Sequence, residues 1–290
     1  MDWCHKLKLE KPVILTTKQN ICGVIIRKIL LKHWDFVETN EIFDGTPIYE
    51  FKNIRLVYSE KDVIDANHSD VLEADLLLYG SRHKSEANKP SLLTHVTGNL
   101  SEDNSHGGNP LELSFASTRA IRESYLGLVE EKELLELTDF DVTVEATHHG
   151  PTSLKTPLVF IEVGSTETEY KNEKAVLAVA KTIMNICLNK EEKIIKPSIC
   201  FGGGHYATRF DELMEVTPVA VGHILPKYRK PNLTVQIVEQ MIEKTVEKVE
   251  WAIIDRSSLN ADQIQIIKDG CSKYGVEVVK AKDIKYGKIT

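Results

Sequence analysis

Short apolar or alternating runs bounded by turn residues recur along the chain and predict β-strands. They lie at residues 12–16, 54–58, 76–79, 92–96, 142–146, 158–163, 197–201, 219–224 and 251–254. Apolar residues at helical spacing separate several of them, most clearly in 170–188, where Ala175, Val179, Ile183 and Ile186 fall on one face. Further helices are predicted over 232–247 and 260–274. The second half of the chain therefore alternates strand with helix.

This alternation predicts βαβ units, and hence a largely parallel sheet covered by helices on both faces. The short connection between the strands at 142–146 and 158–163 indicates an antiparallel excursion. We therefore expect an α/β fold of three α/β/α layers with a mixed, mostly parallel sheet. No break in composition divides the chain, so a single domain over residues 1–290 is predicted.

Composition excludes several classes of protein. The longest apolar runs, 74–79 and 217–225, are far shorter than the roughly 20 residues that span a bilayer. Residues 1–11 contain no signal-peptide core. The formal net charge of −7 argues against sequence-independent binding of polyanions over the whole surface, although local basic patches such as Lys227, Arg229 and Lys230 stay open. Five widely spaced cysteines favour neither a disulfide framework nor a cysteine zinc site. We expect a cytoplasmic protein.

Histidines supply the main functional signal. Seven of the ten occur in or beside glycine-containing segments at the ends of predicted strands, namely His83, His95, His106, His148, His149, His205 and His223. Imidazole transfers protons near neutral pH and binds metals. Taken singly, each of these histidines fits a structural role as well as a functional one. Because ligands of open α/β sheets sit beyond the carboxyl ends of strands, the set as a whole predicts a shared pocket.

Two adjacent imidazoles precede a Gly-Pro turn in His148-His149-Gly150-Pro151. Neighbours on an extended strand point to opposite faces, so both rings reach one pocket only if the backbone turns there. Gly150-Pro151 favours such a turn. One ring would then act on substrate or metal while a carbonyl or carboxylate holds the other. A single functional histidine beside a structural one is the alternative.

Glutamates lie in the segment before the helix predicted over 170–188. Thr166 and Glu169 form a capping-box pattern, which accounts for those two residues. Glu162 and Glu167 are left as candidates for general base or metal ligand, although acids are also common in the first turn of a helix.

The run Gly202-Gly203-Gly204-His205 allows close approach of a substrate and offers amide donors for an oxyanion or phosphate. A tight turn beside a spectator histidine is the alternative. The spacing matches neither a dinucleotide fingerprint nor a phosphate loop. No H-E-x-x-H or G-x-S-x-G motif is present, so metal binding is not diagnosed by spacing. Activation of water by histidine or metal is favoured over a covalent mechanism.

Six segments in one order resemble the archaeal and plant type of D-aminoacyl-tRNA deacylase. They are Ser81-Arg82-His83-Lys84-Ser85-Glu86, residues 95–99, Gly108-Asn109-Pro110, Thr147-His148-His149-Gly150-Pro151-Thr152, Glu162-Val163-Gly164-Ser165-Thr166-Glu167 and Gly202-Gly203-Gly204-His205-Tyr206. Thr168, Tyr170 and Thr208 depart from the pattern, where Glu, Trp and Pro would be expected. These departures concern packing at helix starts rather than the histidines.

The resemblance implies a phosphorylase/hydrolase-like fold and hydrolysis of the ester bond of D-aminoacyl-tRNA, which releases D-amino acids from mischarged tRNA. It also implies zinc, with two ions per chain, and a monomer whose partner is the tRNA acceptor end rather than DNA or a membrane. Two other functions stay open: a zinc-dependent amidohydrolase or carboxypeptidase-like hydrolase of small molecules, and a non-catalytic tRNA-binding module.

Together, the residues and the resemblance give three sets of candidates. The catalytic set is His148, His149, Glu162, Glu167 and His205. The substrate-binding set is Arg82, His83, Lys84, Gly150, Thr152, Ser165, Gly203 and Gly204. The metal set is His83, His95, His148 and His205, although spacing does not fix the ligands.

Overall fold

The computed structural model describes residues 9–189, 191 and 193–289. Most of the N-terminal segment in which no signal peptide is expected therefore lies outside the described residues. Within the described part of the chain, no helix is long and apolar enough to cross a membrane.

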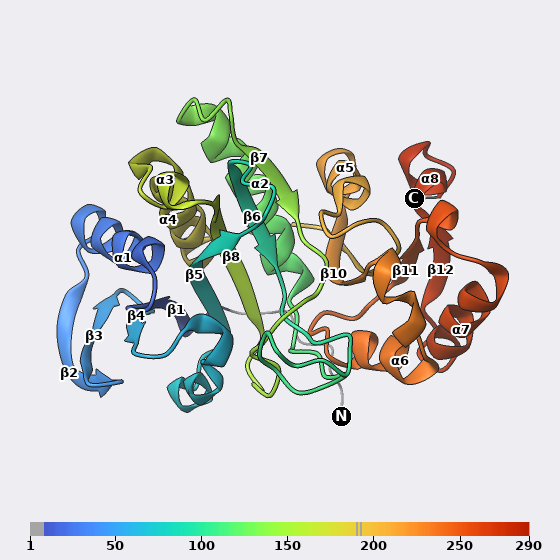
Figure 1. The fold of residues 1–290 in the computed structure, drawn as a ribbon, viewed down its shortest axis with the longest axis horizontal. Helices are drawn as coiled ribbons and strands as arrows, with labels where there is room; N and C mark the ends of the chain where they lie inside the picture. The colour runs from blue at the N-terminus through green and yellow to red at the C-terminus, as the bar shows by residue number, and fades with distance from the viewer. Residues whose placement is uncertain (1–8, 190, 192, 290) are drawn as a thin grey trace.

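The larger of two sheets has eight strands in the order β2-β3-β4-β1-β5-β8-β6-β7 (Figure 1). They are β1 (Pro12–Thr17), β2 (Val37–Phe43), β3 (Thr46–Phe51), β4 (Ile54–Ser59), β5 (Leu76–Lys84), β6 (Ser91–His95), β7 (Asp141–Val144) and β8 (Leu158–Ser165). The central run β4-β1-β5-β8 is parallel. The β2-β3-β4 meander is antiparallel, and β6 is antiparallel to β8 and parallel to β7.

The smaller sheet has four parallel strands in the order β10-β9-β11-β12. They are β9 (Lys196–Phe201), β10 (Val219–Leu225), β11 (Trp251–Ile254) and β12 (Glu277–Lys280). Hydrophobic side chains of this sheet, such as Val221 and Ile253, belong to the same buried cluster as Leu15 and Leu78 of the larger sheet. Other side chains of this sheet, such as Phe201 and Ile254, belong to a second buried cluster. A single domain over residues 1–290 stays a prediction.

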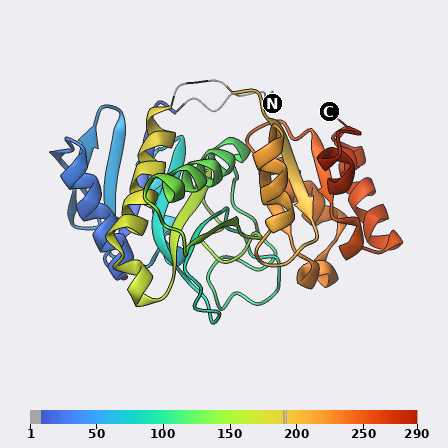
Figure 2. The ribbon, with the colours of Figure 1, turned by 90° about the horizontal axis from the view of Figure 1, so that it is seen from above.

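Helices pack against both sheets. They are α1 (Ile21–His33), α2 (Thr118–Leu134), α3 (Glu167–Tyr170), α4 (Glu173–Leu188), α5 (Thr208–Val216), α6 (Val235–Glu243), α7 (Ala261–Ser272) and α8 (Ala281–Lys285), with 3-10 turns η1 (Val63–Asp65), η2 (Asn67–Leu72), η3 (Lys227–Asn232) and η4 (Arg256–Ser258). Helices α1, α2 and α4 pack on the larger sheet, and α2 also contacts β9 and β10 of the smaller sheet. Figure 2 shows α2, in green, between the helices of the two sheets.

The expected α/β fold with a mixed, mostly parallel sheet is confirmed. The alternation did not reveal that the strands divide between two sheets. The antiparallel excursion is real, but β6 lies between β7 and β8, so these two strands do not pair with each other. Strand β5 also runs on to Lys84, which places His83 within the strand and not in a loop beyond it.

Candidate active site

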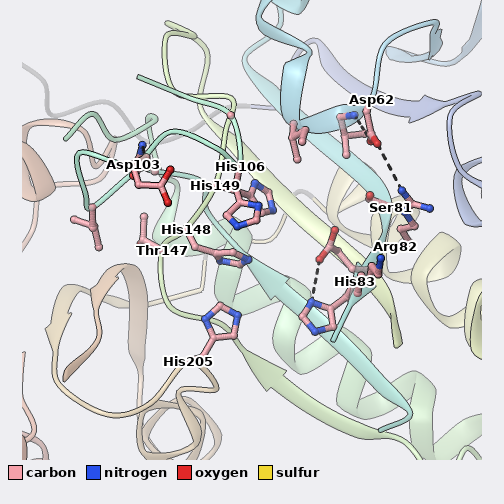
Figure 3. Close-up of a pocket in the computed structure, with 18 of the residues that line it drawn as sticks. Asp62, Ser81, Arg82, His83, Asp103, His106, Thr147, His148, His149 and His205 are labelled. Carbon is pink, nitrogen blue, oxygen red and sulfur yellow. Dashed lines mark hydrogen bonds and ion pairs between the residues drawn. The ribbon is translucent and has the colours of Figure 1, made fainter. Parts of the chain in front are cut away.

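A cavity of about 480 Å³ lies at the junction of the two sheets. Its walls come from β5, from η1, from the loop after β6 and from the turn at Thr147, His148 and His149, with His205 and Arg229 on the side of the smaller sheet. Figure 3 shows the rings of His83, His148, His149 and His205 gathered around it. Segments distant in sequence therefore meet in one hollow.

The floor of the cavity is one face of the larger sheet. A side chain at Gly80 would touch Ile26 of α1 and Ile183 of α4, so this position faces the helices. Alternation along β5 then directs His83 to the opposite face. The neighbouring Glu162 of β8 lies in register with Ser81, and His95 of β6 with Phe160. The pleat thus brings His83, Glu162 and His95 to the face that the helices leave uncovered.

Glu145 is the centre of the polar cluster. It directly follows β7, and its N–H donates to the carbonyl of Thr94 at 3.0 Å. Its buried carboxylate has Oε1 2.9 Å from Nε2 of His205 and Oε2 3.3 Å from Nδ1 of His83. Nε2 of His95 lies 3.9 Å from the same Oε2. One carboxylate therefore faces three imidazoles.

Residues 145–149 pass between the two sheets and are tied to the smaller one. The N–H of Ala146 donates to the carbonyl of His205 at 2.8 Å, and that of Thr147 donates to the carbonyl of Ile224 at 3.1 Å. These bonds explain why a histidine that follows β9 reaches a glutamate that follows β7.

The two adjacent imidazoles do share the cavity. His149 has a φ of +43°, in the left-handed region that non-glycine residues seldom adopt, and this provides the backbone turn that a shared pocket requires. Nδ1 of His148 donates to the carbonyl of Ala146 at 2.8 Å, and Nδ1 of His149 donates to that of Gly150 at 2.6 Å. Because carbonyl oxygens only accept, Nε2 of each neutral ring carries the free lone pair.

Burial and neighbouring charges shift the pKa values of these groups in different directions. Burial, reinforced by the neighbouring His95, lowers the pKa of His148 well below its usual range and that of His149 to about 3. Burial also lowers the pKa of His83 and His95, but Glu145 and Glu162 outweigh it and leave both pKa values raised. Burial raises the pKa of Glu145, yet the surrounding histidines hold it well below the usual value. The cluster thus combines neutral imidazoles with ionised carboxylate.

The donor set fits a metal ion. Three groups each have one ligand atom per residue within 4.8 Å of the others: His95, His148 and His149; Glu145, His148 and His205; His83, Glu145 and Glu162. Within the described residues, Nε2 of His95 and both carboxylate oxygens of Glu145 are buried without an aligned hydrogen bond. Such orphaned atoms are costly unless a cation satisfies them. Imidazole nitrogen and carboxylate oxygen are ligands that zinc accepts.

Most of the predicted site residues meet at this cavity. Those that line it are Arg82, His83, Lys84, His148, His149, Glu162 and His205. His95 lies beneath them, with Nε2 3.5 Å from Oε2 of Glu162. His106 also lines the cavity, whereas His223 is buried behind Thr147, 3.4 Å from its hydroxyl.

Other candidates lie apart from the cavity. Glu167 is exposed at the start of α3 and forms an ion pair with Lys171 at 2.6 Å. Ser165 is buried, and its hydroxyl donates to the carbonyl of Lys89. The hydroxyl of Thr152 donates to Glu112 and accepts from the N–H of Asn109, so it braces the loop after β6.

The glycines serve packing. The N–H of Gly203 already donates to the hydroxyl of Ser258 at 3.2 Å, and that of Gly202 donates to the carbonyl of Leu225, so neither amide is free for an oxyanion. Neither Gly203 nor Gly204 lines the cavity. Gly150 lies against backbone atoms of Gly107, Gly108 and Ile64. Its lack of a side chain lets three segments of the cavity wall approach each other.

Four residues of the site were not candidates from the sequence: Glu145, Asp62 and the two tyrosines that contact the histidines. Asp62 lines the cavity and forms an ion pair with Arg82 at 3.7 Å. Nε2 of His83 lies 3.2 Å from the hydroxyl of Tyr206, and Nδ1 of His205 lies 2.9 Å from that of Tyr228. A carboxylate between Val144 and Ala146 in an otherwise apolar run was the available signal for Glu145. The tyrosines carried no such signal.

Comparison with known proteins identifies relatives of this chain. A family model described as D-aminoacyl-tRNA deacylase matches residues 71–279. A protein named D-aminoacyl-tRNA deacylase from Pyrococcus furiosus is 34% identical over 275 residues, which cover 92% of this chain and 99% of that protein. One of the same name from Methanosarcina barkeri is 37% identical over 258 residues, covering 87% and 81%.

A crystal structure described as a conserved protein of unknown function has the same fold. It aligns with a TM-score of 0.88 and 28% sequence identity over 96% of this chain and 97% of the other. The similarities in sequence extend over most of the chain and include every element that forms the cavity floor. The chain belongs to the D-aminoacyl-tRNA deacylase family.

Proposed function

We propose that this protein hydrolyses the ester bond of D-aminoacyl-tRNA and releases the free D-amino acid and tRNA. The observation that carries the proposal is the buried carboxylate of Glu145, ringed by His83, His95 and His205 in the cavity of a chain that belongs to this family. Such a cluster suits the activation of water for attack on an ester carbonyl.

Zinc is the proposed cofactor. His95, His148 and His149 would hold one ion through their Nε2 atoms, and His83, Glu145 and Glu162 a second one. Bound zinc lowers the pKa of a coordinated water and polarises a carbonyl oxygen. Two ligand groups beside one another support the expected pair of ions per chain.

The remaining steps belong to side chains of the cavity. One carboxylate oxygen of Glu162 would hold the ion, and its other oxygen is our candidate to accept the proton of the attacking water. The water oxygen bonds to the ester carbonyl carbon, the ester bond to the ribose oxygen breaks, and the proton passes to that ribose oxygen. The amides of Gly202 and Gly203 are engaged and are not available to stabilise the oxyanion. An ion held by the histidines and carboxylates of the cavity would supply that stabilising charge.

Basic residues at the mouth of the cavity would bind the tRNA. Arg82, Lys84 and Arg229 all line it, and Lys227 lies on the same turn as Arg229. Arginine and lysine are the residues that bind phosphate in nucleic acids without reading the base. These side chains would hold the phosphates of the acceptor end while the aminoacyl group enters the cavity. An L side chain would be rejected there by steric clash.

Family membership supports this function over a small-molecule amidohydrolase or carboxypeptidase-like hydrolase, and over a non-catalytic tRNA-binding module. Hydrolysis of a free D-amino-acid ester as efficient as that of D-aminoacyl-tRNA would favour the small-molecule enzyme. The monomeric state, the cytoplasmic location and the lack of DNA or membrane partners stay predictions.

Metal removal tests the chemistry. The purified protein is dialysed against a chelator, and release of D-tyrosine from D-tyrosyl-tRNA is measured before and after zinc is added back. We expect loss of activity on removal and recovery at about two zinc ions per chain, counted by elemental analysis. Full activity in a metal-free sample would refute the zinc proposal.

A further inference from the structure

Tyr228 contacts the histidine that links the two sheets. Its hydroxyl lies 2.9 Å from Nδ1 of His205, whose Nε2 lies 2.9 Å from Oε1 of Glu145. A hydroxyl can donate or accept a hydrogen bond. Tyr228 can therefore fix the His205 ring whether Nε2 faces the carboxylate with its proton or presents its lone pair to a metal.

The ring of His205 is more exposed than the rings of His83 and His95. Its side chain is 35% exposed, whereas those of His83 and His95 are 7% and 0% exposed. The main chain of His205 is anchored, because its carbonyl accepts from the N–H of Ala146. The contacts with Tyr228 and Glu145 therefore set the orientation of the ring, rather than the position of the backbone.

Tyr228 belongs to a basic turn at the cavity mouth. It lies on η3 between Lys227 and Arg229, and Arg229 lines the cavity. Among the described residues, neither of these cations has a carboxylate within 4.0 Å. The N–H of Lys227 donates to the carbonyl of Gly203 at 3.0 Å, which joins η3 to the turn that precedes His205. A phosphate bound here would hold the same turn that holds His205.

We propose that Tyr228 is a positioning residue that couples the binding of a tRNA phosphate at η3 to the alignment of His205 against Glu145. This inference rests on the proposed deacylase function. The phosphate neutralises Arg229 and restrains η3, and the restrained Tyr228 hydroxyl holds the ring of His205 in place. An aminoacyl ester without phosphates leaves η3 unrestrained and is hydrolysed with a lower kcat.

Tyr228→Phe removes the hydroxyl and keeps the ring. The loss of one hydrogen bond predicts a kcat for D-tyrosyl-tRNA lower by about five- to tenfold. The KM is expected to stay within about twofold, because the cations that bind phosphate remain. Tyr49→Phe is the matched control, since Tyr49 contacts Glu38 on the β2-β3 hairpin outside the cavity. Its kcat should equal that of wild type, and both variants should keep the thermal midpoint.

Coupling is tested with a substrate that has no phosphate, D-tyrosyl-adenosine. The wild-type kcat should be higher on D-tyrosyl-tRNA than on D-tyrosyl-adenosine, and both Tyr228→Phe and Arg229→Gln should shrink this ratio. The double variant should shrink it no further than the stronger single variant, because both changes interrupt one path.

Three outcomes are decisive. An unchanged kcat in Tyr228→Phe, or an equal loss in Tyr49→Phe, overturns the role of Tyr228. Independent, multiplicative losses in the double variant overturn the coupling to phosphate. A wild-type protein that does not deacylate D-tyrosyl-tRNA overturns the proposed function itself, a result distinct from active wild type with an unaffected Tyr228→Phe variant.

Discussion

Three backbone segments of the cavity wall meet at Gly150. This crossing makes the geometry of the cavity sensitive to a single methyl group at that position. A Cβ at this position would lie 2.4 Å from the amide nitrogen of Gly108, 2.8 Å from the carbonyl carbon of Gly107 and 2.8 Å from the carbonyl oxygen of Ile64. All three are backbone atoms, so no side-chain rotation relieves the clash. Ordinary contacts begin at about 3.4 Å, and Gly150→Ala must therefore displace the loop after β6 by about 1 Å.

This displacement should affect activity more than stability. Overpacking of this kind costs about 1–3 kcal/mol of unfolding free energy, or a few degrees in Tm. A shift of about 1 Å in groups that position a substrate costs about a hundredfold in rate. We expect kcat/KM for D-tyrosyl-tRNA to fall by about a hundredfold. Deacylation kinetics and thermal unfolding measure the two effects separately.

Gly275→Ala is the matched control. Gly275 has a φ of +66° with open space around it, so alanine there is strained by about 1 kcal/mol but displaces nothing in the cavity. It should lower stability and leave kcat/KM unchanged. If Gly150→Ala keeps wild-type kcat/KM while losing as much stability as Gly275→Ala, the crossing does not position the cavity wall and the reasoning fails.

Two further substitutions test the buried acids. Glu145→Gln keeps the shape of the side chain but removes the charge that faces three imidazoles. Zinc affinity, measured by competition with a chelator, should therefore fall by about 10–100-fold or more. An unchanged affinity would show that Glu145 is not part of the metal site. Burial raises the pKa of Asp211 to about 6, although Thr143 and the N–H of Val144 donate to it. The folded state therefore takes up this proton more readily than the unfolded state, and wild-type stability should fall by about 2 kcal/mol relative to Asp211→Asn as pH rises from about 4 to 6. Parallel denaturation profiles of the two proteins over this range would contradict a buried, protonated Asp211.

Much of the sheet could be predicted because its strands are apolar. Every strand expected from the sequence is present, since burial on both faces leaves the short runs that the pattern detects. Strand β2 (Val37–Phe43) was missed because most of its residues are exposed at the edge of the sheet. Helix α1 was missed because the β-branched residues Val24, Ile25, Ile26 and Ile29 obscure its helical spacing.

The candidate site was predictable where chemistry is unusual for its position. Adjacent imidazoles before Gly150 and a glutamate at 162 in an apolar strand both belong to the cavity wall or floor. Glu167 was chosen by proximity in sequence, but a position in the first turn of α3 directs it to solvent. Glu145 acquires its role only because β6 enters between β7 and β8 with His95, and because the N–H of Ala146 ties His205 of the smaller sheet beside it. Such non-local pairing leaves little trace in one sequence.

The proposed function requires that this cavity selects and hydrolyses D-aminoacyl esters of tRNA. The most direct test is the rate of deacylation of D-tyrosyl-tRNA and L-tyrosyl-tRNA, made on the same tRNA and assayed with the same zinc-loaded protein. We expect rapid release of D-tyrosine, with L-tyrosyl-tRNA decaying at its spontaneous rate. Equal enzymatic rates on the two substrates would contradict it.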